Sequence, residues 1–83
     1  MTLSLEELRA SSKVIGAKQV KKAISKGLAK KVYLAVDAEP HIIEPIKAMC
    51  IEHGVDFQAA ESMKKLGEAC GIDVGSAAVA IVL

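Results

Sequence analysis

Short apolar runs along the chain predict four strands. Residues 31–36 are rich in β-branched and apolar residues without alternation, and residues 77–83 are continuously apolar. Both patterns are typical of strands covered on both faces. A third strand begins at residues 14–15, where Val is followed by Ile. The fourth covers residues 55–59, where apolar and polar residues alternate with the period of a strand.

Helical spacing of apolar residues predicts a helix before each of these strands. The first covers residues 2–10, with Ser4 and Glu7 placed as a capping-box pair. The third starts near Pro40, and because Pro45 follows so soon, it begins either after Pro45 or with distorted first turns. Ser62 is a candidate cap for the fourth helix, which ends at Gly71.

Strict alternation of helices and strands with short connections predicts crossover helices on both faces of a central sheet. We therefore expect an α/β fold, a three-layer α/β/α sandwich with a central sheet of about four strands. Residues 1–83 should form one domain, since a chain of this length has no room for a second. The order of the strands within the sheet is left open.

The second predicted helix, from about Lys18 to Lys26, is amphipathic and basic. Val20, Ala23 and Ile24 share its apolar face, and four lysines gather on the other: Lys18, Lys21, Lys22 and Lys26. Gly16 precedes this helix and leaves the first free N–H groups accessible to a partner. Lysines, free donors and the positive end of the helix dipole predict a phosphate site. A merely solvated helix face is the alternative.

The distribution of charge along the chain supports a phosphate site more strongly than the net charge does. Net charge is only +1, yet seven of the eleven basic residues fall between positions 13 and 31, where there is no Asp or Glu. One basic stripe on a balanced protein is a pattern to weigh for nucleic-acid binding. No segment is long enough to span a bilayer and no signal peptide is apparent at the N-terminus, so we expect a cytoplasmic protein that does not bind membranes.

Motifs for catalysis or cofactor binding are missing from the sequence. There is no nucleotide-binding glycine motif and no nucleophile elbow, and the carboxylates occur singly. Cys50 and Cys70 lack a C-x-x-C spacing, and Cys50 with His53 supplies too few ligands for zinc. We therefore expect a protein that is not an enzyme and that needs no cofactor and no metal.

A second unusual segment lies between Gly71 and Gly75, where Ile72 and Val74 occupy a predicted loop. Apolar loop residues either tuck under the edge of the sheet or form an exposed surface on which an unstacked base could lie. With one Phe, one Tyr and no Trp, the chain lacks the aromatic platforms of many RNA-binding folds. Aliphatic packing would have to take their place.

Two segments of the sequence resemble a known family. The first contains the predicted phosphate site, and the second contains most of the apolar loop between Gly71 and Gly75. Residues 15–27, Ile-Gly-Ala-Lys-Gln-Val-Lys-Lys-Ala-Ile-Ser-Lys-Gly, and residues 61–74, which contain Leu-Gly-Glu-Ala-Cys-Gly-Ile-Asp-Val, are similar to the kink-turn RNA-binding superfamily of ribosomal proteins L7Ae and L30e. The second motif is the more specific. The sequence is most similar to the short stand-alone, ribosomal-protein-like members of Gram-positive bacteria.

The resemblance implies recognition of a kink-turn, a sharply bent RNA helix whose sheared G·A pairs widen the major groove. It implies that Gly16 lets the backbone approach, that Lys18 and Gln19 read guanine edges, and that Lys22 reaches a guanine or its phosphate. Lys18 and Gln19 replace the Asn and Glu of archaeal and eukaryotic relatives, which predicts a larger electrostatic share of affinity and less discrimination among bases. The resemblance further implies that Ile72, Asp73 and Val74 cradle an extruded nucleotide. We also expect Lys21 to contact the RNA, with additional contacts from the following lysines: Lys13, Lys26, Lys64 and Lys65.

These observations predict a monomeric RNA-binding protein that stabilises kink-turns in ribosomal RNA or in a regulatory RNA such as a riboswitch. The alternative is a ribosome-associated protein–protein adaptor with only non-specific RNA affinity, in which the apolar loop meets a partner protein.

Overall fold

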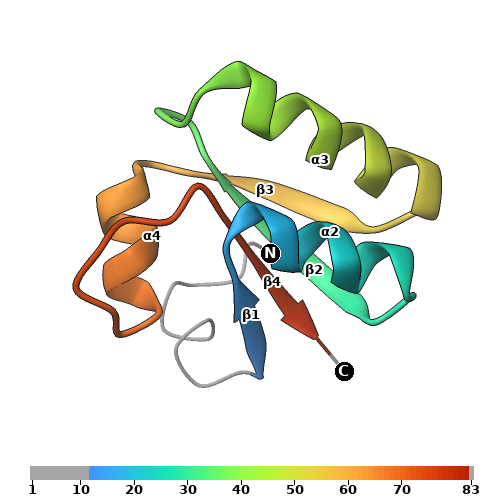
Figure 1. Ribbon diagram of the computed structural model, residues 1–83, viewed down its shortest axis with the longest axis horizontal. Coiled ribbons are helices and arrows are strands. Elements are labelled where there is room, and N and C mark those ends of the chain that lie inside the picture. Colours follow the sequence, from blue (N-terminus) through green and yellow to red (C-terminus); the bar gives the residue numbers. More distant parts are fainter. Residues whose placement is uncertain (1–11, 83) are drawn as a thin grey trace.

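The computed structural model describes residues 12–82, a chain of alternating strands and helices (Figure 1). The strands within this range are β1 (Lys13–Ile15), β2 (Ala29–Ala35), β3 (Asp56–Ala60) and β4 (Ala78–Val82). The helices within it are α2 (Ala17–Ser25), α3 (Pro40–His53) and α4 (Met63–Ala69). The alternation predicted from the sequence is confirmed in this range, and the helix expected over residues 2–10 lies outside it.

The four strands form one mixed sheet in the order β1-β4-β2-β3. Strand β4 is antiparallel to both of its neighbours, whereas β2 and β3 are parallel. Strands β1, β2 and β3 therefore all end at the same end of the sheet, which is where β4 begins. Helices α2, α3 and α4 each follow one of these strands, so all three start at this end. The strand order thus brings the starts of α2, α3, α4 and β4 to one end of the sheet, although these segments are distant from one another in the sequence.

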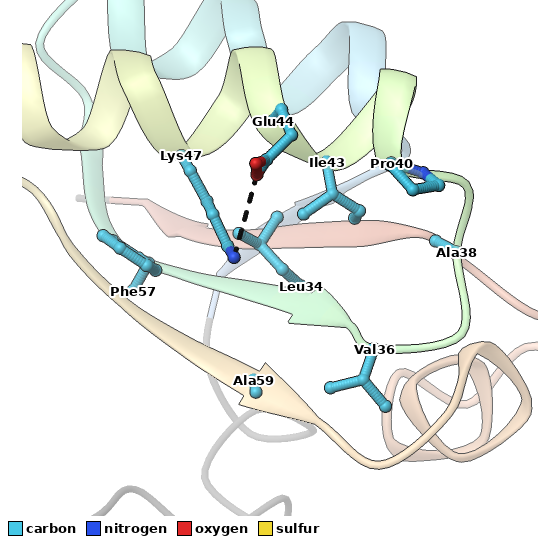
Figure 2. Close-up of a pocket in the computed structure, with 9 residues that line it drawn as sticks. All are labelled: Leu34, Val36, Ala38, Pro40, Ile43, Glu44, Lys47, Phe57 and Ala59. Atoms are coloured by element: carbon cyan, nitrogen blue, oxygen red, sulfur yellow. Dashed lines mark ion pairs between the residues drawn. The ribbon is translucent and has the colours of Figure 1, made fainter.

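Helices cover both faces of the sheet. Val32 and Leu34 of β2 share one face with their β4 partners Ala80 and Ala78, and α2 and α3 pack together over this face. The small alanine side chains let these helices come close to the sheet. Tyr33 and its partner Val79 point to the opposite face, where α4 lies; Figure 2 shows α3 above β2 and α4 below it. The predicted three-layer α/β/α sandwich is confirmed.

The core consists of the apolar stripes that the sequence pattern places inward. Val20 and Ile24 of α2 are fully buried, as are Ile46 and Cys50 of α3 and Leu66 of α4. Burial of each such aliphatic side chain contributes about 1.5–3 kcal/mol. The apolar face of α2 is thus anchored in the core, and its lysine-rich face points away from the core.

Helix α3 begins at Pro40 and continues through Pro45, so of the two alternatives left open, a start after Pro45 is wrong. The N–H groups of Ile42 and Ile43 both donate to the Glu39 carbonyl, at 2.9 and 3.2 Å, which tightens the first turn. Pro45 has no N–H to donate to His41. His41 is exposed, so water can reach its carbonyl.

Candidate nucleic-acid interface

Helix α2 begins at a backbone conformation that requires glycine. Gly16 caps the helix with φ 102° and ψ 145°, a region that side chains of L-residues rarely occupy. Its N–H donates to the Ala78 carbonyl at 2.9 Å, and its carbonyl accepts the first intrahelical bond from Val20 N–H at 3.0 Å. The N–H groups of residues 17–19 precede that bond. Apart from the neighbours of Gly16 in the chain, no atom of residues 12–82 lies within 4 Å of the position that a Cβ of Gly16 would occupy. The start of α2 is therefore open to a partner.

The lysines of α2 form an exposed cationic stripe. Lys18, Gln19 and Lys22 are exposed and Lys21 is half-buried, while Lys26 is exposed just after the last turn. Within residues 12–82, no ion pair engages any of the four lysines predicted for this stripe. Their charges are therefore available to an external anion. The spacing of four residues between Lys18, Lys22 and Lys26 keeps them on one face of the chain.

The segment Gly71–Gly75, which we call the 71–75 loop, packs on α4 through its backbone. A Cβ at Gly67 of α4 would collide with the Val74 carbonyl oxygen, and a Cβ at Gly75 would lie 3.1 Å from Met63. Ile72 N–H donates to the Gly67 carbonyl at 3.1 Å. The loop thus lies closer to α4 than any side chain at Gly67 would permit.

This close packing leaves the predicted apolar residues of the loop accessible to solvent. Val74 is 69% exposed, Asp73 is exposed and Ile72 is half-buried. The alternative in which both apolar residues tuck under the sheet is therefore wrong for Val74. An exposed valine on a closely packed loop is the arrangement expected if the loop forms an apolar surface on which an unstacked base could lie.

The start of α2 lies close to the segment that joins the 71–75 loop to β4, whereas the loop itself lies against α4 (Figure 1). The carbonyl of Ala78, the first residue of β4, accepts hydrogen bonds from Gly16 N–H at 2.9 Å and from the Ser76 hydroxyl at 2.8 Å. One acceptor therefore joins the residue that starts α2 to the residue that follows the loop. The structure brings together the two segments that sequence analysis singled out separately.

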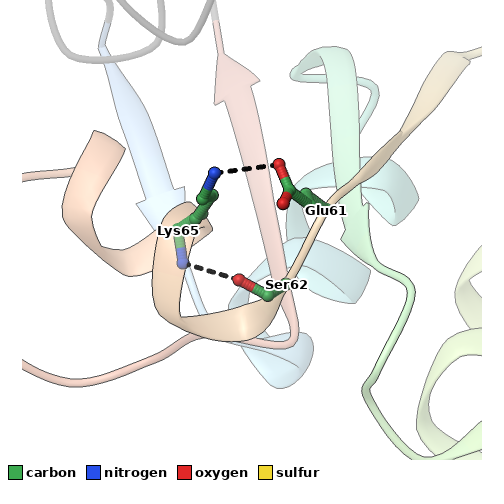
Figure 3. A network of polar contacts seen from close by, with 3 residues as sticks. All are labelled: Glu61, Ser62 and Lys65. Atoms are coloured by element: carbon green, nitrogen blue, oxygen red, sulfur yellow. Dashed lines mark hydrogen bonds and ion pairs between the residues drawn. The ribbon is translucent and has the colours of Figure 1, made fainter.

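The start of α4 is fixed by two capping interactions. Ser62 Oγ accepts from Lys65 N–H at 3.0 Å, as predicted for a cap, and Lys65 Nζ lies 3.0 Å from Glu61 Oε2 (Figure 3). Asp37 Oδ1 accepts from Met63 N–H at 2.8 Å. Although Asp37 lies shortly before Pro40, where α3 begins, its carboxylate caps α4. Lys65 is thus engaged by an acid, unlike the lysines of α2.

The additional lysines predicted as contacts occupy different places around this end of the molecule. Lys64 is exposed on α4, whereas Lys13 is half-buried on β1, close enough to Cys70 for its charge to act on that thiol. Burial raises the pKa of both Cys50 and Cys70, an effect that Lys13 partly opposes at Cys70. Neither thiol is therefore an activated nucleophile at neutral pH.

A separate groove of about 440 Å³ lies between α3 and the edge of the sheet, away from the lysine stripe (Figure 2). Its walls are largely apolar, and Lys47 and Glu44 form a 3.8 Å ion pair at its mouth. It is lined by Leu34, Val36, Ala38, Pro40, Ile43, Glu44, Lys47, Phe57 and Ala59. Phe57 and Val36 are exposed, so the surface of the groove is apolar.

Among residues 12–82, no three His, Cys, Asp or Glu side chains are grouped so as to hold a metal ion. In the same range, no helix combines the length and the apolar character needed to cross a membrane.

Comparison with known proteins identifies the family. The model of the "Ribosomal protein L7Ae/L30e/S12e/Gadd45 family" matches residues 4–83. The chain belongs to the L7Ae/L30e/S12e/Gadd45 family. The resemblance stated from residues 15–27 and 61–74 is thereby confirmed. Both segments lie within the matched range, so the candidate interface is part of the family domain.

Relatives in this family include short bacterial proteins of similar length. The chain is 47% identical over 75 residues to an "RNA-binding protein" of Bacillus pumilus, covering 90% of this chain and 92% of the relative. It is 48% identical over 75 residues to "RNA-binding protein YbxF" of Geobacillus stearothermophilus, with the same coverage. Among L7Ae-type structures, the "Giardia lamblia 15.5kD RNA binding protein" superposes with a TM-score of 0.83 at 28% identity. This match covers 95% of the chain and 65% of the Giardia protein.

Proposed function

We propose that this protein is a non-enzymatic, cytoplasmic RNA-binding protein that recognises kink-turns in structured RNA and stabilises their bent form. The observation that carries the proposal is the shared acceptor at Ala78, which joins Gly16 at the open start of α2 to Ser76, the residue after the 71–75 loop. Cations for phosphates and an apolar surface for a base thus lie at one end of the molecule. Relatives that share most of the chain's length are named as RNA-binding proteins, which supports the RNA as partner.

The basic helix supplies the contacts to the RNA helix. With its first turn in the widened groove, exposed Lys18 and Gln19 would meet guanine edges, and Lys22 one turn later would reach a guanine or its phosphate. Gly16 has no side chain to hold the RNA away, and the free N–H groups that follow it favour a phosphate. Lys21 and Lys26 would add to the field that attracts the RNA.

The 71–75 loop supplies the contact to an extruded nucleotide. Val74 and Ile72 offer aliphatic surface, and Asp73 offers an acceptor for a base amino group. The outlying lysines, Lys13, Lys64 and Lys65, would contribute to phosphate attraction, with the contribution of Lys65 reduced by Glu61. A protein that binds only the kinked RNA shifts a pre-existing bending equilibrium toward that state.

The proposal is tested by titrating the protein into a kink-turn duplex labelled at both ends and following fluorescence transfer. The control duplex has its sheared G·A pairs replaced by Watson–Crick pairs. Tight binding with folding of the first RNA alone is expected. Equal, salt-sensitive binding to both RNAs would reduce the function to non-specific RNA contact.

A protein–protein adaptor is the second candidate, and the groove between α3 and β3 is the observation that favours it. Its apolar walls, with exposed Phe57 and Val36, lie apart from the lysine stripe. Salt dependence separates the two functions, because phosphate contacts release counterions and an apolar protein interface does not. Failure to bind either RNA at low salt would favour the adaptor.

A further inference from the structure

A chain of hydrogen bonds links the β2–α3 connection to the start of α2 through α4 and the segment after the 71–75 loop. Asp37 Oδ1 accepts from Met63 N–H at 2.8 Å, and the Met63 carbonyl accepts from Ser76 N–H at 3.1 Å. Ser76 Oγ then donates to the Ala78 carbonyl at 2.8 Å, which also accepts from Gly16 N–H at 2.9 Å. We call these four bonds the Asp37–Gly16 chain. Two of its residues, Met63 and Ser76, precede and follow the 71–75 loop in the sequence.

Ser76 occupies the middle of this chain and is shielded from water. It is only 6% exposed, and both its N–H and its hydroxyl donate within the protein. A buried hydroxyl left without its partner is costly, so its orientation toward Ala78 is strongly preferred. Ser76 therefore fixes the distance between Met63 on α4 and Ala78 beside Gly16.

The 71–75 loop depends on such links because α4 is short. With seven residues, α4 has two turns, and isolated helices of this length are not stable in water. Its position is therefore set by tertiary contacts. Asp37 reaches it from 26 residues away in the sequence and bonds the N–H of its first residue. A displacement of α4 would carry the loop with it, since the loop lies on Gly67.

We propose that Asp37 and Ser76 are positioning residues for RNA recognition. They hold the 71–75 loop at a fixed place relative to the first turn of α2, so that both surfaces engage one RNA. This inference rests on the proposed function, and it predicts that RNA affinity depends on side chains whose role is to bond the protein backbone. Binding surfaces held by such supporting bonds lose affinity when their support is removed.

The decisive comparison uses two variants with the same change in charge. Asp37→Asn keeps a side-chain oxygen that accepts from Met63 N–H, whereas Asp37→Ala removes the acceptor. Both variants remove the negative charge of Asp37, so any gain in RNA affinity from weaker repulsion of the phosphates is the same in both. We expect Asp37→Ala to bind kink-turn RNA about five-fold more weakly than Asp37→Asn, the scale of one lost hydrogen bond. Equal affinities of the two variants would overturn the proposal.

An RNA-free measurement keeps this proposal separable from the proposed function. Hydrogen exchange of the free protein should be faster in Asp37→Ala than in Asp37→Asn at the amides of Met63, Ser76 and the loop. Exposed Glu52, at the far end of α3, gives the control Glu52→Ala, which should leave these amides unchanged. If the wild-type protein fails to bind kink-turn RNA, the proposed function fails, yet these amides still report on the chain. Unchanged exchange in Asp37→Ala would overturn the positioning role whatever the RNA result.

Ser76→Ala provides an independent test through a double-variant cycle. If Ser76 acts by placing the loop, its loss should reduce the further effect of Val74→Ser on RNA affinity at least two-fold. The effect of Lys26→Ala, on the opposite end of α2, should be the same in both backgrounds. Full additivity with Val74→Ser would contradict a positioning role and leave Ser76 as a contributor to stability alone.

Discussion

The two halves of the candidate interface are built in different ways. The first turn of α2 presents long, solvated side chains, and its lysines have no ion-pair partners among residues 12–82. The 71–75 loop presents little charge, and its position depends on backbone contacts at Gly67 and Gly75. Exposed side chains of α2 can therefore be substituted without displacing the helix. A substitution at Gly67 or Gly75, in contrast, would displace the loop. We therefore expect the later lysines of α2, such as Lys22, to contribute mainly affinity. The 71–75 loop should contribute selectivity for a bent RNA, in addition to the base contacts proposed for Lys18 and Gln19.

The largest effect is expected for Gly67→Ala, which places a methyl group against the Val74 carbonyl. Because backbone atoms cannot rotate out of the way, the loop must shift, at a cost of about 3 kcal/mol at the upper end of core overpacking. Thermal unfolding should show a much lower melting temperature. At temperatures where the variant remains folded, kink-turn affinity should fall at least ten-fold.

Gly54→Ala is the matched control for that change. Unlike the helical Gly67, Gly54 adopts a left-handed conformation, with φ 69°, and it lies at the far end of α3 with open space around it among residues 12–82. The substitution should cost about 1 kcal/mol of stability through backbone strain. It should leave RNA affinity unchanged, and an equal loss of affinity would mean that Gly67→Ala acts through stability rather than through the loop.

Gly16→Ala should have the next largest effect, on the helix side of the comparison. No atom obstructs a methyl group there, so the cost comes from the backbone conformation, about 1–3 kcal/mol. The chain should relax by rotating Gly16, which would disturb its bond to Ala78 and move the first turn of α2. Loss of RNA binding together with lower stability is expected in urea unfolding and binding assays. Wild-type values for both would show that the glycine is not required.

Gln19→Ala and Lys18→Ala should weaken kink-turn binding about 5- to 100-fold, corresponding to about 1–3 kcal/mol for each base-edge contact. Both side chains are exposed, so the free energy of unfolding should change by less than about 0.5 kcal/mol. Binding is measured at fixed salt concentration by fluorescence titration. Unchanged affinity in both variants would remove α2 from the interface.

Lys26→Ala should have the smallest effect, because Lys26 lies one residue beyond the last turn of α2. A lost phosphate contact lowers the slope of log affinity against log salt by about 0.7–0.9. We expect a change of this size or smaller, with folding of the RNA unaffected. A loss as large as that for Lys18→Ala would show that the RNA extends along the whole helix.

The sequence predicted the layers and the cationic stripe because these depend on local periodicity. Val20 and Ile24 point inward for the same reason that Lys18 and Lys22 point outward. The exposure of Val74 could not be decided from the sequence, since it depends on the loop lying against Gly67, a contact between backbones. Asp37 lies between a predicted strand and the helix start near Pro40, so its local context did not indicate a partner 26 residues away on α4. Its actual partner on α4 is fixed by the strand order, which the sequence left open.

The central claim is that the later lysines of α2, such as Lys22, supply affinity and that the 71–75 loop supplies selectivity for the bent RNA. Dissociation constants of the wild-type protein, Lys22→Ala and Val74→Ser, measured for the kink-turn duplex and its Watson–Crick control, test it most directly. Lys22→Ala should weaken binding to both RNAs. Val74→Ser should weaken binding about five-fold for the kink-turn alone, as expected for a modest apolar contact with one base, and it should leave the melting temperature unchanged. Equal effects of Val74→Ser on both RNAs, or no effect on either, would contradict the account.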